Sequence, residues 1–191
     1  MKLGVVITAS FCTINKTLEV LKNLKNAGYD IYPILSSKII EYDTRFGKAE
    51  DIVSKIEEIA EKKVVKDIVE AEKFGPINKM DAMIVIPATG DFIAKMANGI
   101  TDNAANLAVK ATIRNQKPII IAVSTNDGLG LSGQNIMKLL IMKNVYFVPF
   151  GQDDFEKKPN SLVAHFDMVI PTIESALQGK QIQPVIREYK R

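Results

Sequence analysis

The stretch from residue 83 to residue 103 constrains this chain more than any other. It begins with a short apolar run, MIVI (83–86), and continues as PATGDFIAKMANGITDN (87–103). The run predicts a buried strand, and the apolar residues at 93, 96, 97 and 100 predict an amphipathic helix. A strand that leads through small and hydroxyl residues into a helix presents backbone N–H groups and the positive end of the helix dipole to an anion. The pattern predicts a phosphate site near Thr89, and an ordinary junction capped by Thr89 or Asp91 is the alternative.

The rest of the chain alternates between strand-like and helix-like segments. Apolar runs predict strands at 3–8, 30–35, 83–86, 119–123 and 145–149. Helices are predicted at 14–27, 49–62, 66–74, 93–100, 101–111, 136–142 and 171–177, the last with Pro171 at its first position. This alternation predicts a single-domain α/β fold over residues 1–178, with three α/β/α layers around a parallel, Rossmann-like sheet. Residues 179–191 show little pattern and form a tail that either lies along a neighbouring segment or is loose.

Composition and charge narrow the function classes. The 191 residues carry a net charge of +3 with scattered lysines, so no basic stripe predicts nucleic-acid binding. Cys12 is the lone cysteine and His165 the lone histidine, which are too few for a zinc site or an internal disulfide. No apolar run approaches the length of a membrane span, and the apolar N-terminal run is too short for a signal peptide. We therefore predict a cytoplasmic protein without metal or membrane segment, and a structural or surface role for His165.

Small polar residues also follow three other predicted strands. They are Ala9, Ser10 and Thr13 after the first strand, Ser36 and Ser37 after the second, and STNDGLG (124–130) after the fourth. Because the carboxyl ends of parallel strands share one edge of a sheet, we expect these loops to meet and to bind a ligand. Ser10 and Thr13 either donate to a phosphate or cap the first helix. The first loop lacks the G-x-G-x-x-G fingerprint, which disfavours an NAD-type site there.

The central stretch resembles a known family. PAT (87–89), IAK (93–95) and ANGI (97–100), with Asp102, are similar to the central motif of flavoproteins that bind flavin mononucleotide (FMN). That family includes phosphopantothenoylcysteine decarboxylases, peptidyl-cysteine decarboxylases and flavin prenyltransferases, and the resemblance covers residues 3–150. It implies a flavoprotein-type fold, a trimer-based homo-oligomer and bound FMN. The implied FMN contacts are Thr8, Ala9, Ser10, Phe11, Ser36, Ser37, Pro87, Ala88, Thr89, Gly90, Asn98, Ser124, Thr125 and Asn126.

Two departures from the decarboxylase pattern bear on the reaction. The decarboxylases carry a catalytic histidine shortly before the central strand, whereas residues 64–74 contain none. Their later Pro-x-Met-Asn motif is replaced by VSTN (123–126), in which only Asn126 matches. Cysteine decarboxylation is therefore disfavoured, and the sequence identifies no catalytic residue.

Other segments resemble one branch of this family, the B subunits of dipicolinate synthase. The matching segments are TRFG (44–47), ATIRN (111–115), STND (124–127), FGQDD (150–154) and KKPNS (157–161). The resemblance implies a dehydrogenase-like partner, the A subunit of dipicolinate synthase, with which the chain would oxidise a dihydrodipicolinate-level precursor to dipicolinate during sporulation. NADP would then enter through the partner. The alternatives are a non-catalytic partner that has lost the flavin and a flavin-dependent decarboxylase.

A small dicarboxylate substrate calls for a cation, and two arginines are candidates. Arg45 lies in the loop EYDTRFG (41–47) beside an aromatic residue, and a guanidinium group matches a carboxylate. A surface ion pair is the alternative role for Arg45. Arg114 is the second candidate, although it lies near a predicted helix end, where a cation also favours the helix dipole.

Overall fold

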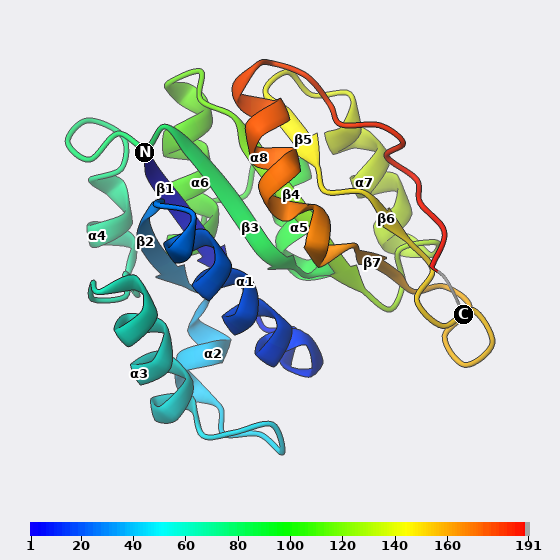
Figure 1. Ribbon diagram of the computed structural model, residues 1–191, viewed down its shortest axis with the longest axis horizontal. Coiled ribbons are helices and arrows are strands. Elements are labelled where there is room, and N and C mark those ends of the chain that lie inside the picture. Colours follow the sequence, from blue (N-terminus) through cyan, green and yellow to red (C-terminus); the bar gives the residue numbers. More distant parts are fainter. Residues whose placement is uncertain (190–191) are drawn as a thin grey trace.

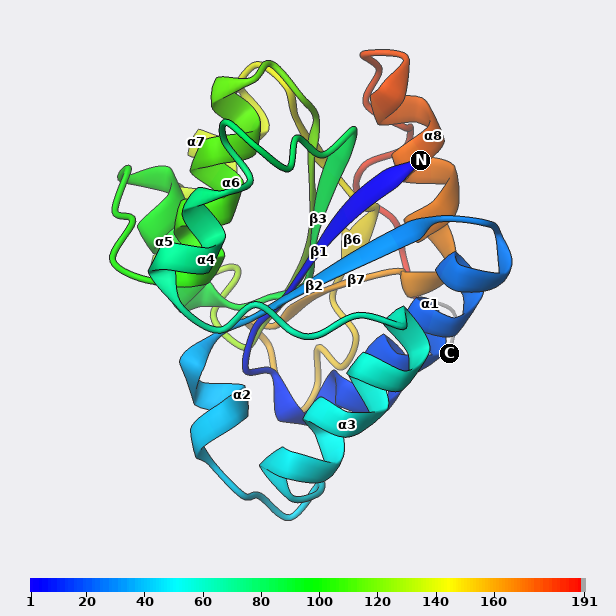
Figure 2. The same cartoon turned by 90° about the vertical axis from the view of Figure 1, so that its left-hand side faces the viewer.

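The computed structural model describes residues 1–189 and shows three layers, with a central sheet between two layers of helices (Figure 1). In Figure 2 the sheet is seen nearly edge-on, with α4, α5, α6 and α7 on one face and α1, α3 and α8 on the other. The predicted single-domain α/β/α architecture is therefore confirmed. Both faces of the sheet are covered, which is why its strands are continuous apolar runs.

Five strands form the parallel part of the sheet. They are β1 (Lys2–Ile7), β2 (Asp30–Leu35), β3 (Ala82–Ala88), β4 (Ile119–Thr125) and β5 (Val145–Phe147), in the spatial order β2-β1-β3-β4-β5. Every residue of β3 is buried. A fully buried strand therefore lies at the centre of the sheet, and its carboxyl end lies in the middle of the edge at which the parallel strands end.

Two short antiparallel strands complete the sheet of seven and were not predicted. They are β6 (Phe150–Gly151) and β7 (Leu162–Ala164). β7 pairs with the last residues of β4, and β6 pairs with β7. Strands of two and three residues are too short to show an alternating pattern, so the sequence could not indicate them.

The helices cover the two faces of the sheet. They are α1 (Ile14–Asn26), α2 (Ser37–Glu41), α3 (Ala49–Ala60), α4 (Ile68–Glu72), α5 (Gly90–Ala97), α6 (Ala104–Arg114), α7 (Leu131–Leu140) and α8 (Val169–Leu177), with two 3-10 turns, η1 (Phe11–Thr13) and η2 (Phe166–Met168). The short helix α2 was not predicted.

Four predicted helix ends were wrong. α5 ends at Ala97, and Ile100 lies beyond it with an exposed side chain. α6 is capped by Asn103, whose side chain accepts a hydrogen bond from the backbone N–H of Asn106 at 2.9 Å, rather than by Thr101 or Asp102. α7 begins at Leu131, five residues before the predicted start, and Pro171 is the third residue of α8 rather than the first. In each case a local cap or turn decided the boundary, and apolar spacing does not encode it.

The tail from Gly179 to Tyr189 lies along β6. The N–H of Phe150 donates to the carbonyl of Val185 at 3.0 Å, and the N–H of Arg187 donates to the carbonyl of Phe150 at 2.9 Å. These backbone bonds attach a segment without apolar periodicity to the edge of the sheet (Figure 1). Of the two alternatives, the tail therefore lies along a neighbouring segment.

Candidate functional site

Two adjoining cavities lie at the carboxyl edge of the parallel strands. Cavity A has a volume of about 370 Å³ and is lined by the loops after β1, β2 and β3 and by the start of α6. Cavity B has a volume of about 740 Å³ and is lined by the loops after β1, β3 and β4, by the loop between β6 and β7, and by Phe46 and Tyr189. Both cavities border Ala9, Thr89 and Asp91. The turn after β3 therefore separates two halves of one cleft.

Most of the predicted cofactor contacts border this cleft. Thr8, Ala9, Ser36, Ser37 and Thr89 line cavity A. Ala9, Ser10, Phe11, Thr89, Gly90, Ser124, Thr125 and Asn126 line cavity B. Pro87 and Ala88 are the last two residues of β3 and are buried behind the turn. The fold thus brings together loops that are far apart in the sequence.

Thr8 fastens the turn between β3 and α5. Its buried hydroxyl group donates to the carbonyl of Pro87 at 2.7 Å and accepts a hydrogen bond from the N–H of Thr89 at 3.1 Å. The same oxygen lies 3.1 Å from Oγ1 of Thr89. Three contacts therefore occupy the Thr8 hydroxyl, which fixes where α5 starts.

The first turn of α5 opens onto the cleft without a side-chain cap. Thr89 is the N-cap residue, yet its side chain makes no capping hydrogen bond. The first backbone N–H groups of a helix have no acceptor within the helix, so those of α5 are directed at the region that both cavities border. The start of α5 at Thr89 and Gly90 therefore lies beside both cavities.

Gly90 allows this turn to approach the loop after β4. A Cβ atom at Gly90 would lie 2.6 Å from Oγ of Ser132 and 3.1 Å from Oγ1 of Thr125. Contacts that short are not tolerated without movement of one partner. Only glycine therefore lets the start of α5 and the β4–α7 loop form one continuous wall of cavity B.

Three serines at the cleft differ in whether their hydroxyl groups have a hydrogen-bond partner. Oγ of Ser10 lies 3.0 Å from Oγ of Ser124, so these hydroxyl groups pair across cavity B. Oγ of Ser36, beside cavity A, is buried and has no hydrogen-bond partner; within residues 1–189 it is the one buried side-chain polar atom in that state. An unpaired buried hydroxyl group is costly unless a ligand supplies its partner.

Asp127 is a fixed carboxylate at cavity B that sequence reasoning missed. Oγ1 of Thr125 donates to Oδ1 of Asp127 at 2.7 Å. This bond, together with hydrogen bonds from Ser132, holds the pKa of Asp127 below its ordinary value. Asp127 therefore stays ionised, and Thr125 is oriented by it. The signal in the sequence was the pair of polar residues two positions apart directly after a buried strand.

Within residues 1–189, the cations that line the two cavities are four lysines. Lys38 and Lys95 line cavity A, and Lys16 and Lys158 line cavity B. Nζ of Lys95 lies 3.1 Å from Oδ2 of Asp102, and the hydrogen bond from Lys95 lowers the pKa of Asp102. Their positions depend on helix phase and loop path, which is why scattered lysines gave no signal in the sequence.

Three predicted site residues do not line either cavity. Arg45 is exposed and stacks over the ring of Phe46, with 4.8 Å from its guanidinium carbon to the ring centroid; Phe46 itself lines cavity B. Arg114 is the last residue of α6, roughly 15 Å along the helix from the residues that line cavity A. Asn98 lies just past the far end of α5, where it donates to the carbonyl of Ala94 at 2.8 Å and accepts from Lys138 at 3.1 Å.

Residues 1–189 offer neither a metal site nor a membrane-spanning helix. No group of three or more histidine, cysteine, aspartate or glutamate residues there could hold a metal ion. None of the described helices combines the length and the apolar character that crossing a membrane requires. His165 contributes Nε2 to a hydrogen bond with the carbonyl of Arg187 at 3.1 Å.

Comparison with known proteins identifies the family. Residues 1–161 match the model of the flavoprotein family. The chain belongs to the flavoprotein family. Within it, this flavoprotein is 42% identical over 187 residues to the B subunit of dipicolinate synthase from Bacillus subtilis (strain 168), a match that covers 98% of this chain and 94% of that protein.

Two solved structures are similar to this chain to different degrees. The crystal structure of the dipicolinate synthase B subunit from Bacillus halodurans superposes with a TM-score of 0.90 at 43% identity, covering 98% of this chain and 96% of that one. The FMN-dependent cysteine decarboxylase SpaF superposes with a TM-score of 0.69 at 19% identity, covering 94% and 97% of the two chains. The second likeness shows the shared fold alone.

Proposed function

We propose that this flavoprotein is the B subunit of a dipicolinate synthase, that it binds FMN in the cleft, and that it works in the cytoplasm of sporulating cells. With a dehydrogenase-like A subunit it oxidises a small dicarboxylate at the dihydrodipicolinate level to dipicolinate. The observation that carries the FMN assignment is the uncapped start of α5, which opens onto both cavities. Two proteins named as B subunits of dipicolinate synthase support the reaction class, because they are 42% and 43% identical to this chain over nearly its full length.

The residues around cavity A fit a phosphate group. The N–H groups at the start of α5 would bind its oxygens together with the hydroxyl group of Thr89. The unpaired hydroxyl group of Ser36 would donate to the same anion, which accounts for a buried polar atom that otherwise has no partner. Lys38 and Lys95 line this cavity, and because Lys95 is paired with Asp102 at 3.1 Å, Lys38 is the cation that would face the phosphate charge.

The residues around cavity B fit a planar ring and an acidic substrate. When bound, the flavin ring accepts the two electrons that leave the dihydropyridine ring as it becomes aromatic. Phe11 and Phe46 line this cavity with apolar surface. Nζ of Lys158 lies 3.8 Å from Oδ2 of Asp153, so Lys16 is the lining cation that would attract a carboxylate of the substrate. The Asp127 carboxylate orients Thr125.

A non-catalytic role is the second candidate. Three sequence-predicted contacts, Asn98, Arg45 and Arg114, do not line the cleft, and the hydroxyl group of Thr8 is occupied within the chain. In that case the nucleotide cofactor of the A subunit, NADP, would take the electrons, and this chain would complete the active site of its partner. A flavin-dependent decarboxylase is the weakest alternative, because residues 64–74 hold no histidine.

Titration of the purified chain with FMN tests the proposal. Quenching of FMN fluorescence should give a dissociation constant in the micromolar range, and a yellow complex should survive gel filtration. Absence of binding at 100 micromolar FMN, roughly the weak end of cofactor affinities, would leave the non-catalytic role as the better account. Anaerobic reduction of the bound FMN by substrate, with and without the dehydrogenase-like partner, would then separate a redox role from a structural one.

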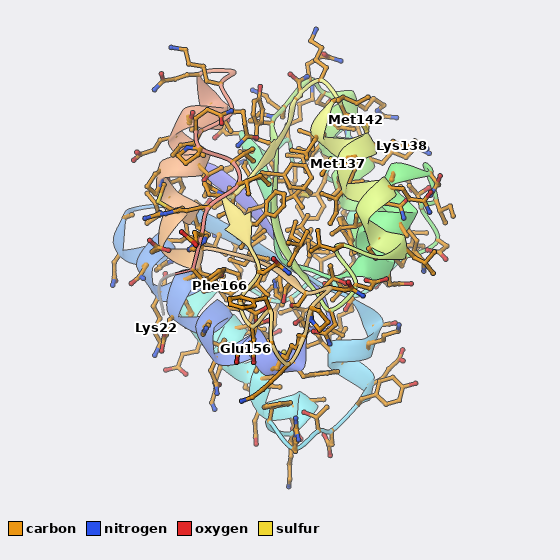
Figure 3. All side chains as sticks on the ribbon, turned by 90° about the vertical axis from the view of Figure 1, so that its right-hand side faces the viewer. Lys22, Met137, Lys138, Met142, Glu156 and Phe166 are labelled. Carbon is orange, nitrogen blue, oxygen red and sulfur yellow. The ribbon has the colours of Figure 1, made fainter. Side chains whose placement is uncertain are left out.

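The proposed assembly contains several copies of this chain, in trimers, together with the dehydrogenase-like partner. Its support is an exposed apolar surface at the end of α7, where Met137 is 53% exposed and Ile141, directly after the helix, is 87% exposed. Figure 3 shows Met137 and Met142 on this side of the molecule beside Lys138. Light scattering after gel filtration measures the assembly, and a monomer at micromolar concentration would contradict it.

A further inference from the structure

The end of the chain is attached to the sheet at two places. The side-chain amide of Gln181 accepts from the N–H of Phe147 and donates to the carbonyl of Phe147, both at 2.7 Å. Farther on, the backbone around Ile186 pairs in parallel with Phe150. An isolated bridge at Ile186 therefore ties this segment to Phe150 of β6, and Figure 1 shows the segment in red alongside that strand.

Tyr189 closes this segment against β7. Its ring stacks on the ring of His165, with 4.0 Å between centroids and 20° between planes. Its hydroxyl group donates to the carbonyl of Ala164 at 2.9 Å, and burial raises the pKa of Tyr189 to about 12. His165 in turn bonds the carbonyl of Arg187. The tyrosine is therefore held by a stack and by hydrogen bonds, as a neutral phenol at physiological pH.

This fixed tyrosine faces the cofactor cleft. Tyr189 lines cavity B together with Asp153 and Lys158, across from the start of α5 and from Cys12. Gly151 permits that position, because a Cβ atom there would lie only 2.1 Å from the carbonyl oxygen of Arg187. The chain thus keeps a glycine where any side chain would push the terminal segment away from the cavity.

We propose that Tyr189, held in place by the segment Gln181–Arg187, forms one wall of cavity B and is a positioning residue for the planar heterocycle bound there. The class of ligand, a flavin ring or a pyridine dicarboxylate, rests on the proposed function, whereas the wall itself rests on the contacts above. A closed wall excludes water from one side of the cavity and presents an aromatic surface to the bound ring.

Cys12 provides a reporter for the wall that needs no cofactor. It is the lone cysteine of the chain and lines cavity B. Cys12 is exposed, so its reaction with a bulky disulfide reagent is already possible in the wild type and should become about twofold faster in Tyr189→Ala and in Gly151→Ala, since both open the cavity on the tail side. Tyr189→Phe, which keeps the stacked ring, and Ile186→Ala, which changes an exposed side chain of the same segment, should react like the wild type.

Unchanged Cys12 rates in both opening variants would overturn the wall. If Gly151→Ala does not fold, Tyr189→Ala and a chain ending at Arg187 carry the test, because each removes the Tyr189 ring and leaves Gly151 as it is. Thermal unfolding and circular dichroism establish that the compared variants are folded.

FMN titration of the same variants tests the positioning role. The dissociation constant of FMN should rise about tenfold in Tyr189→Ala and stay within about twofold in Tyr189→Phe and Ile186→Ala. Equal affinity in all four proteins would refute positioning of the ring by Tyr189. If the wild type does not bind FMN, the proposed cofactor fails, and the Cys12 rates and a parallel titration with dipicolinate still decide whether the wall exists and orders a heterocycle.

Discussion

The two sides of cavity B are built by different means. On one side, the turns after β1, β3 and β4 are fixed by side chains, such as the hydroxyl group of Thr8 bonded to Pro87 and Thr89. On the other side, β7, β6 and the terminal segment are joined by backbone hydrogen bonds between very short strands and closed by the stack of Tyr189 on His165. The first side follows buried strands and is rigid by packing, whereas the second depends on a few contacts near the end of the chain.

This difference predicts that a substitution on the first side disturbs several packed elements, whereas a substitution on the second side disturbs only the terminal segment. Gly90→Ala should have the largest effect on FMN binding, because its new Cβ atom would meet Ser132 and Thr125 where α5 and the β4–α7 loop touch. We expect a loss of about 1 kcal/mol in the free energy of unfolding, measured with urea, because the Ser132 hydroxyl group can rotate away, and loss of measurable FMN binding. Gly151→Ala should only weaken FMN binding, since its new Cβ atom would meet the backbone carbonyl of Arg187 and displace the terminal segment outward.

The comparison would fail if the two glycine variants behaved alike. A Gly90→Ala protein with wild-type stability and FMN affinity would show that the turn after β3 adapts as freely as the tail. Equal losses in both variants would show that the tail is as integral to the sheet as β3.

Thr8→Val examines the same turn through its hydrogen bonds. Valine has nearly the same shape, but the carbonyl of Pro87 and the N–H of Thr89 would lose their partner in a buried place. We expect a loss of about 2 kcal/mol on urea unfolding. Thr17→Val is the matched control, because the fully buried Thr17 only donates to the helix carbonyl of Thr13 at 3.1 Å, and its loss should cost about 1 kcal/mol or less. Similar values for both variants would contradict a special role of Thr8.

The same contrast explains which parts the sequence could predict. Buried strands such as β3 and amphipathic helices such as α3 leave a periodic apolar pattern, so the layers and the edge that carries the site followed from spacing. The loop residues Ser36, Thr89 and Thr125 were found because small polar residues directly follow those strands. Tyr189 could not be found, because its place depends on backbone pairing with β6 and on a stack with a residue 24 positions earlier.

The sequence also did not indicate which cationic side chains line cavity A. Arg114 looked suitable by residue type, but it ends α6 on the side away from cavity A, whereas Lys95 reaches that cavity from the second turn of α5. Which end of a helix reaches the ligand edge follows from the strand direction, and the carboxyl ends of the strands meet the starts of the helices. Cations early in a helix were therefore better candidates than Arg114 at a helix end.

Ser36→Ala separates the contribution of cavity A to FMN binding from its contribution to stability. The Ser36 hydroxyl group is buried without a partner, so its removal should leave the free energy of unfolding unchanged or raise it slightly. FMN affinity should fall about fivefold, because the phosphate would lose one donor. Ser54→Ala, which changes an exposed serine of α3 that lines neither cavity, is the control and should bind FMN within about twofold of the wild type. Loss of stability without loss of affinity in Ser36→Ala would remove Ser36 from the proposed phosphate site.

The smallest expected effect is the pH dependence of stability, which differs between the two sides of cavity B. Asp127, on the side built from the turns after the parallel strands, has a pKa held low by Thr125 and Ser132. Its contribution to stability is therefore present at neutral pH and is lost as the pH falls into the acid range. Tyr189 on the other side has a pKa raised from 10.0 to about 12, so its contribution is complete below pH 10 and disappears as the pH rises toward 12.

The Tyr189→Phe variant cannot ionise at this position and lacks the hydrogen bond to Ala164, so it should be less stable than the wild type by about 1 kcal/mol at pH 9. That difference, measured by urea unfolding at pH 9, 10 and 11, should shrink steadily with rising pH, while other tyrosines titrate equally in both proteins. A constant difference over this range would mean that the phenol is solvated in the folded chain, and the terminal segment would then be a looser wall than its contacts imply.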